Sequence, residues 1–139
     1  MATDLRAIVF QALRADSEIE ALVGDRIIQR ASWNVEDSTV EPPPEATPYL
    51  VYAMSDESPT GPSAMKATRR YLMVWAHDTP GDYGIAIDPL LERVKQVLHA
   101  VEHCETFMEI RFLGKSPDLY DDMLKHIVRY SRFYATLTE

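Results

Sequence analysis

The sequence predicts an α+β fold: a mixed, mainly antiparallel β-sheet with its helices packed on one face. Apolar residues recur at helical spacing in two parts of the chain, and five other segments have the length and composition of strands. Their order, α-α-β-loop-β-β-α-β-β, groups strands in runs instead of alternating them strictly with helices. With 139 residues, 46% of them hydrophobic and 26% charged, residues 1–139 are expected to form a single domain.

The first helical periodicity covers residues 5–15 and consists of Leu5, Ile8, Val9, Ala12 and Leu13. Asp16 or Ser17 can start a second, short helix, and Gly24 supplies the stop signal at its end. Both helices are expected to cover a sheet.

Five segments are predicted strands: residues 26–30, 48–55, 68–77, 107–113 and 124–137. The clearest is 68–77, which places one apolar set on one face and a second set on the other: Tyr71, Met73 and Trp75 against Leu72, Val74 and Ala76. Because both faces are apolar at the centre, one is expected under the helices. The other is expected against something else, such as another subunit.

A long helix is predicted from about Tyr83 to Val101, with an apolar stripe of Ile87, Leu90, Leu91, Val94, Val97, Leu98 and Val101. Pro89 would break the interior of a helix. The helix therefore either begins at Pro89 with Asp88 as its cap, or it kinks there.

Two long connections, residues 31–47 and 56–66, are expected to be loops rich in turn formers. The first contains three consecutive prolines at 42–44, which gives it polyproline character. Loops of this length in a compact domain are usually either functional or partly disordered. A role as a ligand for peptide-binding modules is disfavoured, because no second basic or PxxP-flanking signal accompanies the prolines.

The charge balance limits the possible partners. The formal net charge is −8 and the isoelectric point about 4.9, and no basic block exists beyond one Arg pair at 69–70. Non-specific DNA binding is therefore disfavoured, although an acidic surface suits DNA that must slide past without sticking. No apolar run has the length of a membrane helix, and the first ten residues do not resemble a signal peptide. The single Cys104 fits a reducing compartment.

Two clusters have metal-ligating chemistry. His99 and His103 are four residues apart, with Cys104 beside them, but no fourth ligand follows at a usual spacing. A solvated helix end, where His suits the helix dipole, is the simpler interpretation. The acids Asp118, Asp121 and Asp122 before His126 could hold Mg²⁺. The chain lacks the basic groups a nuclease pairs with such acids, so a solvated hairpin turn is favoured.

Other catalytic signatures are absent: the sequence contains no phosphate-binding glycine loop, no HExxH and no nucleophile elbow. We expect no enzyme activity, no catalytic residues, no cofactor and no bound metal.

A series of short motifs occurs in a fixed order. L-R-A-D at 13–16 and L-V-G-D-R-I at 22–27 precede P-Y-L-V at 48–51, V-W-A at 74–76 and R-Y-S-R-F at 129–133. In this order the chain resembles the tail-completion, or tail-terminator, proteins of long-tailed bacteriophages. The resemblance covers most of the chain. The loop at 31–47 is longer and more acidic than the family pattern.

The resemblance implies a structural virion protein of the tail and neck, assembled in the host cytoplasm. Such a protein forms a ring, commonly of six subunits, at the head-proximal end of the tail tube. The ring ends tube polymerisation and joins the tail to the neck. The implied partners are further copies of the chain, the tail-tube protein and a head-completion protein, while DNA passes through without specific binding.

Specific side chains can be assigned to these surfaces as expectations. The candidates for contacts between subunits or with partners are aromatic: Trp33, Tyr49, Tyr71 and Trp75. The candidates to face the channel are loop acids: Glu36, Asp56 and Glu57.

Three alternatives stay open. A head-completion connector has similar size and ring symmetry and differs in the partner it binds. A small cytoplasmic α/β binding module would be monomeric or dimeric and would have a ligand pocket. A metal-dependent enzyme would use His99, His103 and the acids at 118–122.

Overall fold

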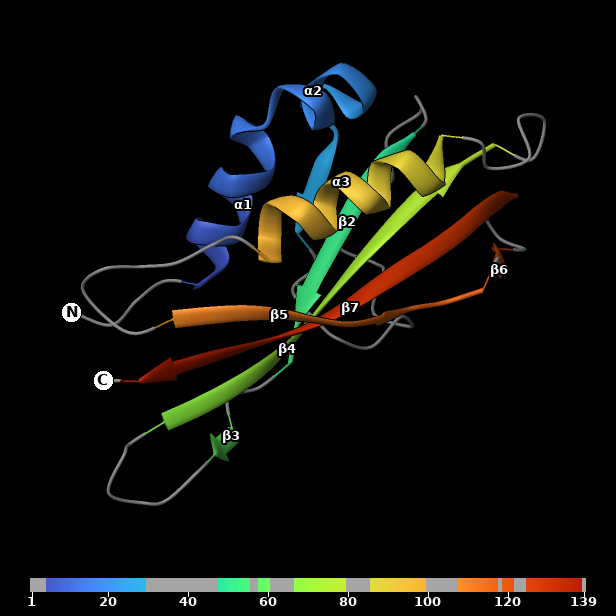
Figure 1. Ribbon diagram of the computed structural model, residues 1–139. Coiled ribbons are helices and arrows are strands. Elements are labelled where there is room, and N and C mark those ends of the chain that lie inside the picture. Colours follow the sequence, from blue (N-terminus) through green and yellow to red (C-terminus); the bar gives the residue numbers. More distant parts are fainter. Residues whose placement is uncertain are drawn as a thin grey trace.

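The computed structural model describes residues 5–29, 48–55, 58–60, 67–79, 86–99, 108–117, 119–121 and 125–138. These ranges contain three helices: α1 (Leu5–Ala15), α2 (Ser17–Val23) and α3 (Ile87–His99). They also contain seven strands: β1 (Ile27–Gln29), β2 (Tyr49–Met54), β3 (Ser58–Thr60), β4 (Ala67–Asp78), β5 (Met108–Lys115), β6 (Leu119–Asp121) and β7 (His126–Thr138). All three helices lie on one side of the sheet (Figure 1), which confirms the predicted α+β fold.

The strands form one sheet in the order β1-β2-β4-β7-β5, with β3 paired to β4 and β6 paired to β7. Only β1 and β2 are parallel; the other pairs are antiparallel. The longest pairing joins β4 to β7 along their length, from Ala67 opposite Thr138 to Asp78 opposite Ile127. These two strands are the centre on which the other elements are arranged (Figure 1).

The helix signals in the sequence correspond to the observed ends of α2. Asp16 is its N-cap, and the carboxylate accepts the Ile19 N–H at 3.1 Å. Gly24 follows the last turn with φ +61°, a conformation that only glycine adopts without strain, and its N–H donates to Glu20 O at 2.8 Å.

The third helix begins two residues before the predicted start at Pro89, so Asp88 lies in its first turn and is not its cap. It starts at Ile87, so Pro89 lies in the first turn, where its missing N–H costs no helical hydrogen bond. Residues 83–85 and 100–101, which were expected to extend this helix, lie outside the described residues.

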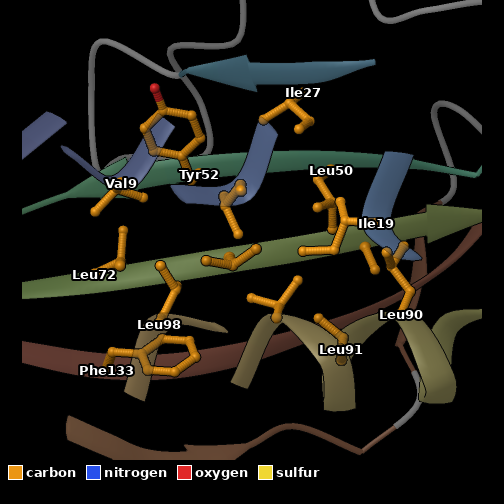
Figure 2. Packing of buried hydrophobic residues seen from close by; sticks show 14 of the residues in the cluster. Val9, Ile19, Ile27, Leu50, Tyr52, Leu72, Leu90, Leu91, Leu98 and Phe133 are labelled. Carbon is orange, nitrogen blue, oxygen red and sulfur yellow. The ribbon is translucent and has the colours of Figure 1, made fainter. Parts of the chain in front are cut away.

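The main core lies between the helices and the sheet. Leu72 and Val74 of β4 and Phe133 of β7 are fully buried beneath the apolar stripe of α3. Figure 2 shows the side chains of Leu90, Leu91 and Leu98 directed from α3 into this cluster, facing those of the sheet. Each such side chain contributes about 1.5–3 kcal/mol of burial free energy. Further members come from α1, α2, β1 and β2: Leu5, Val9, Leu13, Ile19, Val23, Ile27, Leu50, Tyr52 and Met54. The others lie on β4, α3, β5 and β7: Ala76, Ile87, Val94, Ile110 and Ala135.

Two short strands were not predicted. β3 lies within the segment 56–66 that was expected to be only loop, and Pro59 is tolerated there because β3 is an edge strand paired on one side. β6 lies where a hairpin turn of acids was expected. β5 also runs two residues further than predicted, into Gly114 and Lys115, beyond a bulge between Phe112 and Gly114.

An ion pair joins the end of α1 and the start of α2 to α3. Arg93 donates to both carboxylate oxygens of Asp16, at 2.7 Å from Nη2 to Oδ1 and 3.0 Å from Nε to Oδ2. Asp16 is nearly covered, with 10% of its side chain exposed. These hydrogen bonds from Arg93 hold the pKa of Asp16 below its ordinary value of 3.8 and raise that of Arg93.

Asp16 is therefore expected to contribute stability that depends on pH. Because its pKa is lower in the folded than in the unfolded state, the contribution is fully present above the ordinary pKa of 3.8. It is lost as the pH falls through the folded value. In urea unfolding, Asp16→Asn should be less stable than wild type at pH 7 and approach it under acid conditions. Equal differences at both pH values would contradict this account.

A matched variant separates the cap from the charge. The Asn amide oxygen can still accept the Ile19 N–H, whereas Asp16→Ala removes the cap as well. Asp16→Ala should therefore be less stable than Asp16→Asn by about 1 kcal/mol at any pH.

Candidate assembly surface

One edge of the sheet is formed by two strands in line. β5 pairs with residues 131–137 of β7, and β6 pairs with residues 126–128 of the same strand. Among the described strands, neither has a partner on its outer side. We call residues 108–115 and 119–121 the β5–β6 edge. An open strand edge offers backbone N–H and C=O groups to another chain.

This edge carries the exposed large apolar side chains of the described residues. Among the residues whose side chains the structure describes, the exposed large hydrophobic ones are Leu113, Leu119 and Tyr120, which are 48%, 42% and 53% exposed. Leu119 and Tyr120 are consecutive in β6, so their side chains lie on opposite faces of this edge. Exposed apolar groups along an open strand edge, with Tyr among them, are typical of protein interfaces. The β5–β6 edge is therefore the candidate assembly surface.

The turn between β5 and β6 is held by Ser116. This buried side chain accepts the Tyr130 N–H at 3.0 Å, and the Ser116 backbone N–H donates to Tyr130 O at 2.8 Å. Arg129 Nε donates to Ser116 O at 3.2 Å, and the same guanidinium pairs with Asp88 in the first turn of α3. The edge is thus fixed to β7 and to a helix before any partner binds, which lowers the entropy lost on association.

The sheet face opposite the helices is also apolar at its centre, as the two-sided pattern of residues 68–77 predicts. Its buried cluster consists of Tyr49, Val51, Ala53, Trp75 and Val128, with Ile28, Met73 and Tyr130 packed against it. The ring centroids of Trp75 and Tyr130 lie 6.5 Å apart in an edge-to-face contact. We call this the helix-free face.

The predicted contact residues differ in how far the structure exposes them. Tyr49 and Trp75 are 1% and 8% exposed within a single chain, so they support the helix-free face and do not project from it. Tyr71 is partly exposed on the same face. The interface role of all three stays a prediction. Trp33 and the three acids expected in the channel, Glu36, Asp56 and Glu57, lie outside the described residues.

One end of the helix-free face holds a cluster that the sequence analysis missed. Tyr49 stacks on His77 with ring centroids 4.6 Å apart, and His126 meets both rings edge-on at 5.7 Å. The Tyr49 hydroxyl lies 3.4 Å from His126 Nδ1. These three residues are far apart in sequence. The only sequence signal for the cluster was that His77 lies at the end of one predicted strand and His126 near the start of another.

The metal hypotheses gain no support from the described residues. No group of three His, Cys, Asp or Glu side chains in these ranges is arranged to hold a metal ion. His103, Cys104, Asp118 and Asp122 lie outside them. In the same ranges no helix has the length and hydropathy to cross a membrane.

Within the described residues, a groove between α3 and β5 bears on the binding-module alternative. It has a volume of about 240 Å³ and is lined by Leu91, Glu92, Lys95, Phe112, Gly114, Lys115 and Ser131. Ligand pockets usually measure about 300–1,000 Å³ and bury most of their ligand. Lys95 lies 4.5 Å above the Phe112 ring within this groove. Its size and its charged lining do not favour a small-molecule site.

Comparison with known proteins identifies a shared fold. No protein-family model and no curated protein matches the chain. Among solved structures, it is similar to a chain in a structure described as the virion of a native gene transfer agent particle. The TM-score is 0.72 with 18% sequence identity, and the match covers 97% of this chain and 95% of that chain. The fold of this protein is therefore that of the virion chain.

Substitution of Ser116 tests the rigidity of the edge. Ser116→Ala leaves the buried Tyr130 N–H without its acceptor, which should lower the free energy of unfolding by about 1–3 kcal/mol. Leu119→Ser, on the same edge but exposed, should change it by less than about 0.5 kcal/mol. Urea unfolding measures both. Equal midpoints for Ser116→Ala and wild type would show that the hydrogen bond does not hold the turn.

Proposed function

We propose that this chain is a structural virion protein that acts by assembling with copies of itself and with other virion proteins. The observation that carries the proposal is the shared fold with a virion chain of a gene transfer agent over 97% of this chain's length. The exposed apolar side chains on one sheet edge support it, because such surfaces fit partners better than substrates.

Within that class, the proposed role is that of a tail terminator. The chain would form a ring at the head-proximal end of the tail tube, end its polymerisation and join the tail to the neck. The order of sequence motifs, from L-V-G-D-R-I at 22–27 to R-Y-S-R-F at 129–133, supports this narrower role. A head-completion connector is the alternative, and it would bind a portal-side protein instead of the tube protein.

The two edges of the sheet suit a ring. The β5–β6 edge carries the exposed Leu113, Leu119 and Tyr120, whereas the described part of the opposite edge consists of β1 and β3, each three residues long. A closed ring repeats a heterologous contact, in which two different patches of each subunit meet. Chemically different edges supply one such difference, and the β5–β6 edge is proposed as one of the two patches.

The experiment that tests the function is the mass of the purified chain in solution, first alone and then with the tail-tube protein of the same particle. We expect a ring-sized species, or a monomer that becomes a ring on contact with the tube protein. A monomer that ignores the tube protein but binds a portal-side protein would favour the connector. A monomer that binds neither would contradict the proposed function.

The contribution of the β5–β6 edge can be measured in the same assay. Leu119→Ser with Tyr120→Ser removes two exposed apolar groups and should raise the dissociation constant of the ring by about tenfold or more. Gln11→Ser, exposed on α1, is the control and should leave it unchanged. Near-identical thermal unfolding of all variants would show that the fold is intact. Unaltered assembly of the double variant would exclude this edge.

A further inference from the structure

At the end of the helix-free face away from the histidines, the apolar cluster gives way to arginine and tyrosine. The side chains of Leu72 and Val74 enter the helix-facing core, so alternate positions of β4 face the other way. On β4, β5 and β7 these positions hold a set that we call the arginine–tyrosine patch: Arg69, Tyr71, Arg111, Arg132 and Tyr134.

The strand register places these five side chains together. Arg111 of β5 lies opposite Tyr134 of β7, and Tyr134 lies opposite Tyr71 of β4. Arg132 precedes Tyr134 by two positions on the same face, and Arg69 precedes Tyr71 in the same way. Neighbours at such positions are about 4.5–8 Å apart. The patch therefore spans three adjacent strands and is held by their ladders.

The patch has the composition of a protein contact. The Arg69 guanidinium lies 4.6 Å above the Tyr134 ring, and Arg111 pairs with Glu109. Arg111 and Arg132 are exposed, while both tyrosines are partly exposed. Arg and Tyr are the residues most enriched where interface binding energy is concentrated, whereas Lys, which the patch lacks, is depleted there.

The charge of the chain is divided between its parts. The described residues contain 12 of the 14 Lys and Arg residues but only 9 of the 22 Asp and Glu residues. The described residues therefore carry a formal charge of +3, and the rest of the sequence carries −11. The two sum to the net charge of −8. A second copy of the chain thus brings strongly acidic segments to a surface that bears exposed arginines, and opposite charges favour that approach.

We propose that the arginine–tyrosine patch binds an acidic surface of a second copy of this chain. The inference rests on the proposed function, because it names what the helix-free face would contact when copies of the chain assemble. DNA is the competing occupant. Stable DNA binding needs several phosphate contacts, and this patch has three arginines, one paired with Glu109 and one stacked on Tyr134.

The test compares two charge-matched double variants of the full chain. Arg111→Gln with Arg132→Gln changes the patch. Arg14→Gln with Lys125→Gln removes the same charge from exposed positions on α1 and at the turn before β7. Sedimentation velocity gives the dissociation constant of self-association between about 50 and 500 mM salt, a range over which exposed ion pairs become screened. A fluorescent duplex DNA is titrated against each protein.

The patch variant should raise the dissociation constant by about tenfold or more at low salt and lose most of its salt dependence. The control variant should behave as wild type, and thermal unfolding should be the same for all three proteins. The Leu119 and Tyr120 double variant should weaken assembly without removing the salt dependence.

Four results would overturn the proposal. The first is that the patch variant assembles as well as wild type, and the second is that salt does not weaken the assembly of wild type. The third is that the wild-type chain stays monomeric. The fourth is that the patch substitutions abolish DNA binding while self-assembly persists. Rings that form normally with the patch substituted would leave the proposed function intact. A wild-type chain that binds neither itself nor any tube or portal-side protein would remove both.

Discussion

The pairing of β4 with β7 is the constraint on which the rest of the structure depends. Its register sets Leu72 opposite Phe133 under the helices, and Trp75 opposite Tyr130 on the other face. Since side chains alternate along a strand, a slip of one residue would exchange the faces and expose the helix-facing core. β4 is apolar on both faces near its centre, so neither face can be left to solvent there. The three helices cover one of them, and the second cluster is buried on the other.

The remaining surfaces follow from the lengths of these two strands. β7 is longer than β5, and the part that β5 leaves unpaired is taken by β6 after the turn at Ser116. That turn needs buried polar partners because it lies at the sheet, and Ser116 and Arg129 supply them. The same continuation leaves Leu119 and Tyr120 without a covering layer. A rigid apolar edge is therefore a consequence of the pairing.

Local signals were readable in the sequence, and long-range ones were not. The caps of α2 at Asp16 and Gly24 and the alternation of β4 are set by neighbouring residues, so they could be predicted. The strands β3 and β6 are three residues long and lie among turn-forming and acidic residues, so no apolar run marks them. The equally short β1 was marked by its two isoleucines. The exposure of Tyr120 depends on strand order, and the burial of Trp75 on what packs across the sheet. The aromatic residues predicted for the interface belong to the helix-free face, whereas the exposed apolar groups lie on the edge.

The acidity of the chain also has a different meaning once the fold is known. A net charge of −8 suggests an acidic surface throughout, yet the helices and strands together carry more Lys and Arg than Asp and Glu. Two chemically different surfaces meet on β5, where Arg111 belongs to the charged patch and Leu113 to the apolar edge. A partner seated along this strand would approach both at once. Apolar contact gives affinity that salt hardly weakens, and charge complementarity gives orientation and rejects wrong partners. A partner that must dock in one orientation needs both, and β5 is the strand of the described sheet on which they coincide.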